Sequence, residues 1–340
     1  PGATVTAPLA SSLPPRRIFE LGLLAAQLRA TGLIPRALEA WAGTARLSAL
    51  PARLERLEAM RREPATPAAA LFELLVGGRD VDASDLGTGA SLIDPLLAHG
   101  LVEGDGPRLR ARVAILPLSR GYVICDRLDA PLERDLVCWP DDSSYHLAAA
   151  IPPGRRDAWL DLGCGSAIAP LVRHELALRI AGIDINPRAV HYAQLGAALS
   201  CVLHFAPTCG AIGDPVAPAN LVTCNAPLPD EELPAMSVPE VWRRADPGFF
   251  GTLWRTLPRS VRPGGMIVVH AADEAILPAL RDAPGERVIV HYTPEGVPGF
   301  AIAWWRPDAP DRFAVTHRAL TAERPHLDPR DRDDALADAR

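Results

Sequence analysis

The sequence contains no lysine, so all 35 of its basic residues are arginine. This absence excludes every mechanism that needs a lysine base or a Schiff base. No apolar run reaches the roughly 20 residues of a membrane-spanning helix. Residues 1–15 also lack the basic start and apolar stretch of a signal peptide. We therefore expect a cytoplasmic protein that has no membrane partner.

Metal-binding and redox patterns are missing as well. The six cysteines contain no C-x-x-C pair and the nine histidines contain no H-x-x-x-H pair. We therefore predict buried, reduced thiols and no metal site. The formal net charge is −6, and the sequence has no basic run. Because binding to a phosphate backbone normally needs a concentrated positive face, this charge balance disfavours nucleic acid as a partner without excluding it.

A glycine turn directly after a buried strand is the most informative feature that is present. The apolar run 158–162 leads into Gly163-Cys164-Gly165, and a helical pattern over 168–178 follows. A strand, a tight turn and a helix N-terminus in this order hold nucleotide-type ligands. The next apolar run, 178–183, ends in Asp184. A carboxylate at the tip of that strand is where a ribose diol is bound.

Two classes of cofactor bind in this geometry. Dinucleotides need G-x-G-x-x-G, and this turn has Ile168 at the position of the third glycine. Asp161 lies just before the glycines, where a carboxylate repels a pyrophosphate and attracts an ammonium group. S-adenosylmethionine supplies an ammonium group and no phosphate, so the turn favours this cofactor.

Strand and helix patterns alternate from residue 155 to residue 305, which predicts an α/β fold with a doubly wound, mainly parallel sheet. The seven expected strands are 158–162, 179–183, 201–205, 221–224, 266–270, 287–292 and 300–305, and the expected helices are 168–178, 188–199, 239–257 and 274–281. The connection between the last two strands is too short for a parallel crossover. We therefore expect the final strand to be antiparallel.

The N-terminal part has helical spacing instead. Helical patterns are expected over 16–30, 35–47, 52–62, 68–76 and 91–99, followed by strands over 108–116 and 120–126. Helices followed by a β-ribbon are typical of a winged-helix-like or helical recognition domain. The predicted organisation is a flexible lead-in at 1–15, this recognition domain at 16–130, a linker at 131–156, a cofactor-binding domain at 157–310, and a C-terminal extension with a solvated tail at 311–340.

Three segments resemble motifs of the class I S-adenosylmethionine-dependent methyltransferases. The run D-L-G-C-G-S-A from Asp161 is similar to the family's D-L-G-x-G-x-[GA] motif. The run I-D-I-N-P-R-A from Ile183 is similar to its second motif, and R-P-G-G from Arg262 resembles the turn before the fifth strand. The resemblance implies a bound S-adenosylmethionine, released as S-adenosylhomocysteine. It also implies that this cofactor is held by Asp161, Gly163, Cys164, Gly165, Asp184, which binds the ribose hydroxyls, and Ile185, which lies against the adenine.

Asn225-Ala226-Pro227-Leu228 follows the fourth expected strand and resembles the N-P-P-Y motif. That motif belongs to methyltransferases acting on planar nitrogens, such as protein glutamine side chains or the exocyclic amine of adenine. It implies that the Asn225 side-chain carbonyl and the Ala226 backbone carbonyl accept the N–H bonds of the acceptor. Leu228 replaces the aromatic ring that stacks on the planar group, a contact that supports a flipped base by ~1–3 kcal/mol. Tyr145 or Phe249 are the candidate replacements.

Two assignments stay open. The residue beside the adenine amine is Thr208 if the motif is aligned by spacing, and Asp214 if it is aligned by residue type. Ser144 and Tyr145 belong to a polar segment before the first strand. That segment either closes over the amino-acid end of the cofactor or forms an ordinary polar loop.

The combined reading is an S-adenosylmethionine-dependent methyltransferase that acts on an amide or amine nitrogen of a protein or peptide. A tailoring enzyme for a small metabolite is the first alternative, because a nonplanar acceptor has no use for a stacking ring at Leu228. A nucleic-acid base methyltransferase would use the N-terminal domain for docking. An NAD(P)-dependent oxidoreductase and a cofactor-binding protein without activity are the remaining alternatives.

Overall fold

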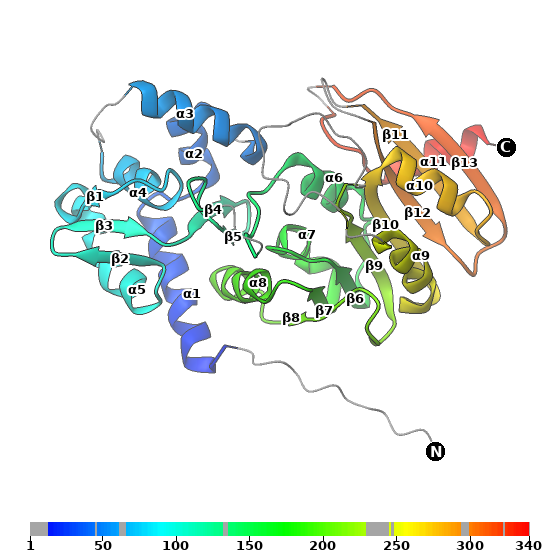
Figure 1. The fold of residues 1–340 in the computed structure, drawn as a ribbon, viewed down its shortest axis with the longest axis horizontal. Helices are drawn as coiled ribbons and strands as arrows, with labels where there is room; N and C mark the ends of the chain where they lie inside the picture. Colours follow the sequence, from blue (N-terminus) through cyan, green and yellow to red (C-terminus); the bar gives the residue numbers. More distant parts are fainter. Residues whose placement is uncertain are drawn as a thin grey trace, which may run out of the picture.

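A twisted eight-stranded sheet forms the centre of the C-terminal part of the chain, and helices cover both of its faces (Figure 1). The computed structural model describes residues 13–44, 46–60, 66–131, 135–228, 245, 248–293, 299–321 and 324–339. The strand order is β13-β11-β12-β10-β9-β6-β7-β8. β12 is antiparallel to β10 and β11, whereas the other neighbouring pairs are parallel. The predicted α/β class with a mainly parallel sheet and the antiparallel strand at 300–305 are thus confirmed.

The bounds of the strands and helices in this part follow the expected alternation closely. The strands are β6 (Arg156–Leu162), β7 (Ala177–Asp184), β8 (Phe205–Cys209), β9 (Ala219–Asn225), β10 (Val261–Ala272), β11 (Glu286–Tyr292), β12 (Phe300–Arg306) and β13 (Arg312–His317). The helices are α6 (Asp142–Ala150), α7 (Ile168–Val172), α8 (Pro187–Leu199), α9 (Phe249–Ser260), α10 (Asp273–Leu280) and α11 (Pro329–Asp338). Part of the helix expected over 239–257 lies outside the described residues.

Three expectations for this part are wrong. The sheet has eight strands rather than seven, because β13 pairs in parallel with β11 at the edge. The strand expected over 201–205 begins at Phe205, since Cys201 has a positive φ of 55° that ends the preceding helix and starts a turn. The helix expected over 168–178 ends at Val172, and a 3₁₀ turn leads directly into β7.

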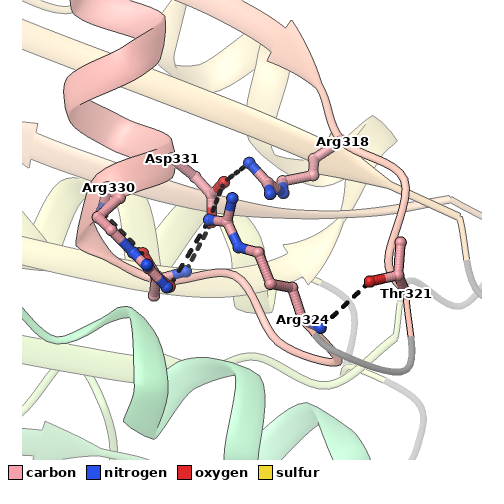
Figure 2. Close-up of polar contacts among 6 residues, drawn as sticks. Arg318, Thr321, Arg324, Arg330 and Asp331 are labelled. Atoms are coloured by element: carbon pink, nitrogen blue, oxygen red, sulfur yellow. Dashed lines mark hydrogen bonds and ion pairs between the residues drawn. The ribbon is translucent and has the colours of Figure 1, made fainter.

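The solvated tail expected at the C-terminus is also wrong. α11 is capped by Asp328, whose side chain accepts a hydrogen bond from the backbone of Arg330 in a capping box completed by Asp331. Asp331 is 2% exposed and forms ion pairs with Arg318 and Arg324 (Figure 2). The mixed charges that indicate a tail in the sequence are therefore paired across a folded helix.

The N-terminal part is mainly helical, as expected, with small antiparallel strands. Its helices are α1 (Pro15–Ala30), α2 (Pro35–Ala42), α3 (Leu50–Met60), α4 (Pro67–Leu75) and α5 (Ile93–Ala98). Its strands are β1 (Val81–Asp82), β2 (Val102–Asp105), β3 (Arg108–Ala111), β4 (Ala114–Leu118) and β5 (Gly121–Cys125). The strand expected over 108–116 is split, because β3 joins the sheet β1-β3-β2 whereas β4 pairs with β5. Thr66 caps α4 through Ala69, as its position predicts.

The two parts share one hydrophobic core. Leu21, Leu24 and Leu28 of α1 belong to the same buried cluster as Trp159 of β6 and Ile180 of β7. A second cluster on the opposite face of the sheet contains the apolar residues of α9 and α10. Within the described residues, no single helix is long and apolar enough to cross a membrane, although the bent pair Pro15–Ala30 and Pro35–Arg56 passes that test of length and composition.

Candidate cofactor and acceptor site

The glycine turn after β6 lies at the carboxyl edge of the sheet. Gly163 and Gly165 have φ values of 68° and 51°, in the left-handed region that favours glycine. The backbone N–H groups of Gly163 and Cys164 donate to the Ile183 carbonyl at 2.8 and 3.0 Å. These bonds hold the turn against the end of β7, which brings the turn and Asp184 together as predicted from their spacing.

Asp184 is held by the backbone on both sides. Its Oδ2 accepts a hydrogen bond from Gly165 N at 2.7 Å, and its Oδ1 accepts one from Asn186 N at 2.9 Å. Burial raises the pKa of Asp184, while these two bonds act in the opposite direction. A carboxylate has about four acceptor positions, so positions remain on both oxygens for hydroxyl groups such as those of a ribose.

Asp161 is in a different environment one strand away. It is 4% exposed, and its Oδ1 accepts a hydrogen bond from the Thr223 hydroxyl at 2.5 Å. Trp159 Nε1 in turn donates to the Thr223 oxygen at 2.7 Å. Burial raises the pKa of Asp161 to about 7, and the bond from Thr223 opposes this shift. A nearby cation such as an ammonium group would favour the ionised form.

The residues expected around the adenine lie next to this turn. Ile185 is 72% exposed, which is unusual for a large apolar side chain. The Thr208 hydroxyl donates to the Gly182 carbonyl at 3.2 Å, and Asp214 Oδ2 accepts a hydrogen bond from Ala211 N at 2.7 Å. Both polar candidates are engaged with their own backbone surroundings, so the choice between Thr208 and Asp214 stays open.

Asn225 is the last residue of β9, and its carboxamide is bound on both ends. Nδ2 donates to Ser143 Oγ at 2.8 Å and lies 3.4 Å from Ser144 Oγ. Oδ1 lies 2.8 Å from His270 Nδ1, and the Ala226 backbone N–H donates to the His270 carbonyl. Ser144 thus lies in α6 against Asn225, so this segment is a helix and not an ordinary polar loop.

Sequence reasoning missed His270 and Tyr292. His270 Nε2 lies 2.6 Å from Tyr292 Oη, and both side chains are buried, at 2% and 1% exposure. Burial lowers the pKa of His270 to about 3, so the ring is neutral at physiological pH. The signal in the sequence was one polar residue at the end of the apolar run 266–269, which ends at the same edge as Asn225.

The aromatic candidates for the missing stacking ring have other neighbours. Tyr145 on α6 stacks against His326 with ring centroids 6.1 Å apart. Phe249 begins α9 and contacts Phe250 in the core of the opposite face. Leu228 accepts a hydrogen bond from Ala245 through its carbonyl. Ala226 and Pro227, the other motif residues, are half-buried.

Metal ligands do not converge in the part of the chain that the structure describes: no group of three or more His, Cys, Asp or Glu side chains there is arranged to hold a metal ion. The prediction that the thiols are buried holds for Cys125, Cys164 and Cys224, but it is wrong for Cys201 and Cys209, which are exposed. Burial raises the pKa of the Cys164 thiol next to the turn.

No protein-family model and no curated protein matches the chain. Among solved structures, a predicted O-methyltransferase from Agrobacterium tumefaciens is 17% identical with a TM-score of 0.38, and the match covers 52% of this chain and 85% of that one. A putative methyltransferase from Streptococcus mutans in complex with S-adenosylhomocysteine is 14% identical with a TM-score of 0.37, covering 48% and 94%. A tRNA methyltransferase from M. jannaschii is 15% identical with a TM-score of 0.41, covering 60% and 61%. At these values, the function has to be inferred from the residues of this chain.

Proposed function

We propose that this protein is an S-adenosylmethionine-dependent methyltransferase that transfers the methyl group to a nitrogen atom. The observation that carries the proposal is the pair of carboxylates at the carboxyl edge of the sheet. Asp184 is fixed by Gly165 and Asn186 with acceptor positions left for a ribose diol. Asp161 is a buried carboxyl group that a cation would ionise. S-adenosylmethionine carries both a ribose and an ammonium group.

The same site suits a dinucleotide poorly. α7, the helix after the glycine turn, has five residues. Aligned peptide dipoles in so short a helix offer little attraction for a pyrophosphate. Asp161 would also place a second carboxylate near the phosphates. These features oppose the oxidoreductase alternative.

A nitrogen acceptor is supported by the position of Asn225 beside the turn. A carbonyl oxygen has two lone pairs, and His270 occupies one of those on Asn225 Oδ1. The second is available to an N–H group of the acceptor, as is the Ala226 carbonyl. Transfer would then be an in-line displacement at the sulfonium methyl, accelerated mainly by holding the two reactants in one geometry. An amide or amine of a protein or peptide fits these acceptors.

The N-terminal module would select the acceptor. We propose that residues 67–111 form a winged-helix-like unit. This is supported by the element order α4, β1, the 3₁₀ helix Ala83–Leu92, α5, β2, β3 and by the sheet order β1-β3-β2. The hairpin that would be the wing is then β2–β3, not the β4–β5 ribbon that follows it. Fluorescence anisotropy with a DNA duplex and an RNA hairpin, at two salt concentrations, would show whether the acceptor is a nucleic acid.

Calorimetric titration tests the cofactor. S-adenosylhomocysteine should bind the native protein, NADH should not, and Asp184→Asn should weaken the binding of S-adenosylhomocysteine by ~10- to 100-fold. Asp157→Asn is the matched control, because Asp157 is exposed near the start of β6. Binding of NADH without S-adenosylhomocysteine would overturn the proposal.

Methyl transfer tests the acceptor class. Tritiated S-adenosylmethionine is incubated with a glutamine-containing peptide, an adenine-containing oligonucleotide and a set of small amines. We expect label in the peptide or the amines. Asn225→Ala should abolish that label while leaving the affinity for S-adenosylhomocysteine within about threefold. Loss of both properties together would mean that Asn225 is a structural residue.

A further inference from the structure

A buried row of hydrogen-bonded side chains leads away from Asn225 into the sheet. Tyr292 Oη lies 2.6 Å from His270 Nε2, and His270 Nδ1 lies 2.8 Å from Asn225 Oδ1. The row runs from β11 across β12 to β10 and β9 on the face that α6 covers, and it ends at the segment 225–227. Nothing in the family resemblance assigns a role to His270 or Tyr292.

The donors and acceptors of this row fit one arrangement. Asn225 Nδ2 donates towards the two serines of α6, so Asn225 Oδ1 faces His270 and needs a donor. His270 Nδ1 therefore carries the ring proton. Since the ring is neutral, Nε2 is an acceptor, and it accepts a hydrogen bond from the Tyr292 hydroxyl. Each member polarises the next, which strengthens the bond that reaches Asn225.

The aromatic residues around His270 keep its ring buried and neutral. Phe300 of β12 stacks on the His270 ring with centroids 5.4 Å apart, and His146 of α6 stacks near it at 6.2 Å. Burial and the nearby His146 disfavour a charge on His270. Because His270 is 2% exposed, water has little access to its ring, and the Nδ1–H group stays directed at Asn225.

α6 is itself held from both ends of the chain. Asp142 accepts a hydrogen bond from Ser48 Oγ at 2.7 Å and pairs with Arg46. His146 contacts His326 with ring centroids 4.7 Å apart. The segment carrying His326 is held in place by the ion pair of Arg324 with Asp331, which Figure 2 shows between Arg318 and Arg324. The serines opposite His270 are therefore fixed as well.

We propose that His270 is a positioning residue. Together with Tyr292 it holds the Asn225 carboxamide so that the second lone pair of Oδ1 accepts a hydrogen bond from the N–H group of the methyl acceptor. This inference rests on the proposed function, in which Asn225 binds that nitrogen. Without the His270 bond, the Ser143 and Ser144 hydroxyls still contact the carboxamide, but a hydroxyl can donate as well as accept and therefore permits either orientation. The carboxamide can then rotate about its last torsion, which is broad and nearly two-fold. Rotation by half a turn would present an N–H group to an N–H group, and the acceptor would no longer be oriented.

Two substitutions of His270 test separately the hydrogen bonds made by Nδ1 and by Nε2. Asparagine at position 270 places an amide N–H near the position of Nδ1, and glutamine places its amide near Nε2. We expect His270→Asn to keep more methyl transfer than His270→Gln. His270→Gln should lose about 100-fold in kcat with the glutamine-containing peptide, because misplacement of a positioning group by about 1 Å has an effect of that size. KM for S-adenosylmethionine and the affinity for S-adenosylhomocysteine should be unchanged in both, which also shows that the variants fold.

The decisive measurement needs no acceptor. In the full-length protein with ¹⁵N-labelled histidine, NMR of the ring nitrogens reports which nitrogen carries the proton, and His270→Gln assigns the signal. We expect the neutral Nδ1–H form at pH 6 to 8, and a change to the Nε2–H form in Asn225→Ala, where the acceptor for Nδ1–H is gone. His191, on α8, is the internal control and should not respond.

The outcomes distinguish the two proposals. An Nε2–H form in the native protein, or a signal that Asn225→Ala leaves unchanged, would overturn the role of His270 even if S-adenosylhomocysteine binds. Equal kcat values for His270→Asn and His270→Gln would overturn it too. A native protein that does not bind S-adenosylhomocysteine would instead refute the proposed function, whatever the state of His270.

Discussion

Two carboxylates at one edge of the sheet differ in how they are satisfied. Asp184 accepts two backbone hydrogen bonds, whereas the contact that stabilises the charge on Asp161 comes from the Thr223 hydroxyl. Burial raises the pKa of both groups, to about 7 for Asp161, where the Thr223 hydrogen bond opposes the shift. The first residue suits neutral hydroxyl groups, and the second suits a ligand that brings its own positive charge.

The raised pKa of Asp161 predicts how cofactor binding depends on pH. Ligand ammonium binds the ionised carboxylate, so below pH 7 the protein must release a proton on binding. The dissociation constant for S-adenosylhomocysteine should rise as pH falls from 7 to 5, by up to about tenfold per pH unit, and should be flat just above pH 7.5. Calorimetry in buffers of different ionisation enthalpy counts the released proton. Asp161→Asn should bind more weakly with no such slope. A flat native profile would show that Asp161 does not face the ammonium group.

The residues expected to bind the cofactor were easier to predict than the residues that contact Asn225. Glycines and an aspartate at fixed spacing are visible in the sequence because backbone geometry requires those residue types. The contacts of His270 and Ser143 with Asn225 were not visible. These two residues are separated by more than a hundred positions, and both reach Asn225 only because α6 packs on the sheet. A polar residue ending an apolar strand shows that a partner exists but does not identify it.

Among the elements, β7 is packed tightly where it approaches the glycine turn. A Cβ on Gly182 would lie 2.9 Å from Cys164 Sγ and 2.9 Å from the Phe205 ring. Gly182→Ala should therefore lower the free energy of unfolding by about 1–3 kcal/mol and weaken binding of S-adenosylhomocysteine, because the turn must move. Gly251→Ala, in α9, is the control, since the nearest atom to its Cβ would be Arg255 Nη1, the end of a flexible side chain, at 3.4 Å. It should be neutral or stabilising by up to about 1 kcal/mol. Urea denaturation compares the two, and equal effects would contradict the steric argument.

The C-terminal helix depends on one buried carboxylate. Asp331 pairs with Arg318 and Arg324, and it completes the cap of α11 (Figure 2). Asp331→Asn removes the buried charge that pairs with Arg318 and Arg324, and Arg324 keeps its longer ion pair with Asp328 at 3.6 Å. We expect a loss of about 3 kcal/mol in the free energy of unfolding. Asp333→Asn, at an exposed position of the same helix, should change it by less than about 0.5 kcal/mol. A comparable loss in both variants, measured by thermal unfolding, would mean that helix charge rather than the buried pair is responsible.

The elements that sequence reasoning misplaced have a common physical cause. β13 alternates weakly and lies at the edge of the sheet, so its pattern differs little from that of a loop. α11 is dominated by charges that are paired through tertiary contacts, which composition cannot show. The segment 201–205 has the pattern of a strand, but the chain turns there because Cys201 adopts a positive φ, and β8 begins only at Phe205. Buried parallel strands such as β6 and β9 were predictable because their apolar runs have no other explanation.

On the scale of the whole molecule, the N-terminal part packs against the sheet through a shared hydrophobic core. The buried residues of α1 continue into the core on the α8 face of the sheet. β5 lies against the end of α8, where Ser200 Oγ accepts a hydrogen bond from Tyr122 N, and the Tyr122 hydroxyl donates to the Leu33 carbonyl. Under the proposed function, an N-terminal part fixed through α1 and β5 would present an acceptor to Asn225 in one orientation.

This continuity predicts one cooperative unit of unfolding. A ligand at 100 times its dissociation constant adds about 2.7 kcal/mol to the free energy of global unfolding. Saturation with S-adenosylhomocysteine should therefore slow hydrogen exchange of the most protected amides equally in α1 and in β6, although α1 does not belong to the cofactor site. Mass spectrometry of peptides covering residues 21–28 and 156–162 makes the comparison, with the exposed turn at 106–107 as the control that should not respond. Protection confined to β6 would show that the two parts unfold separately, because a ligand stabilises only the unit whose unfolding releases it.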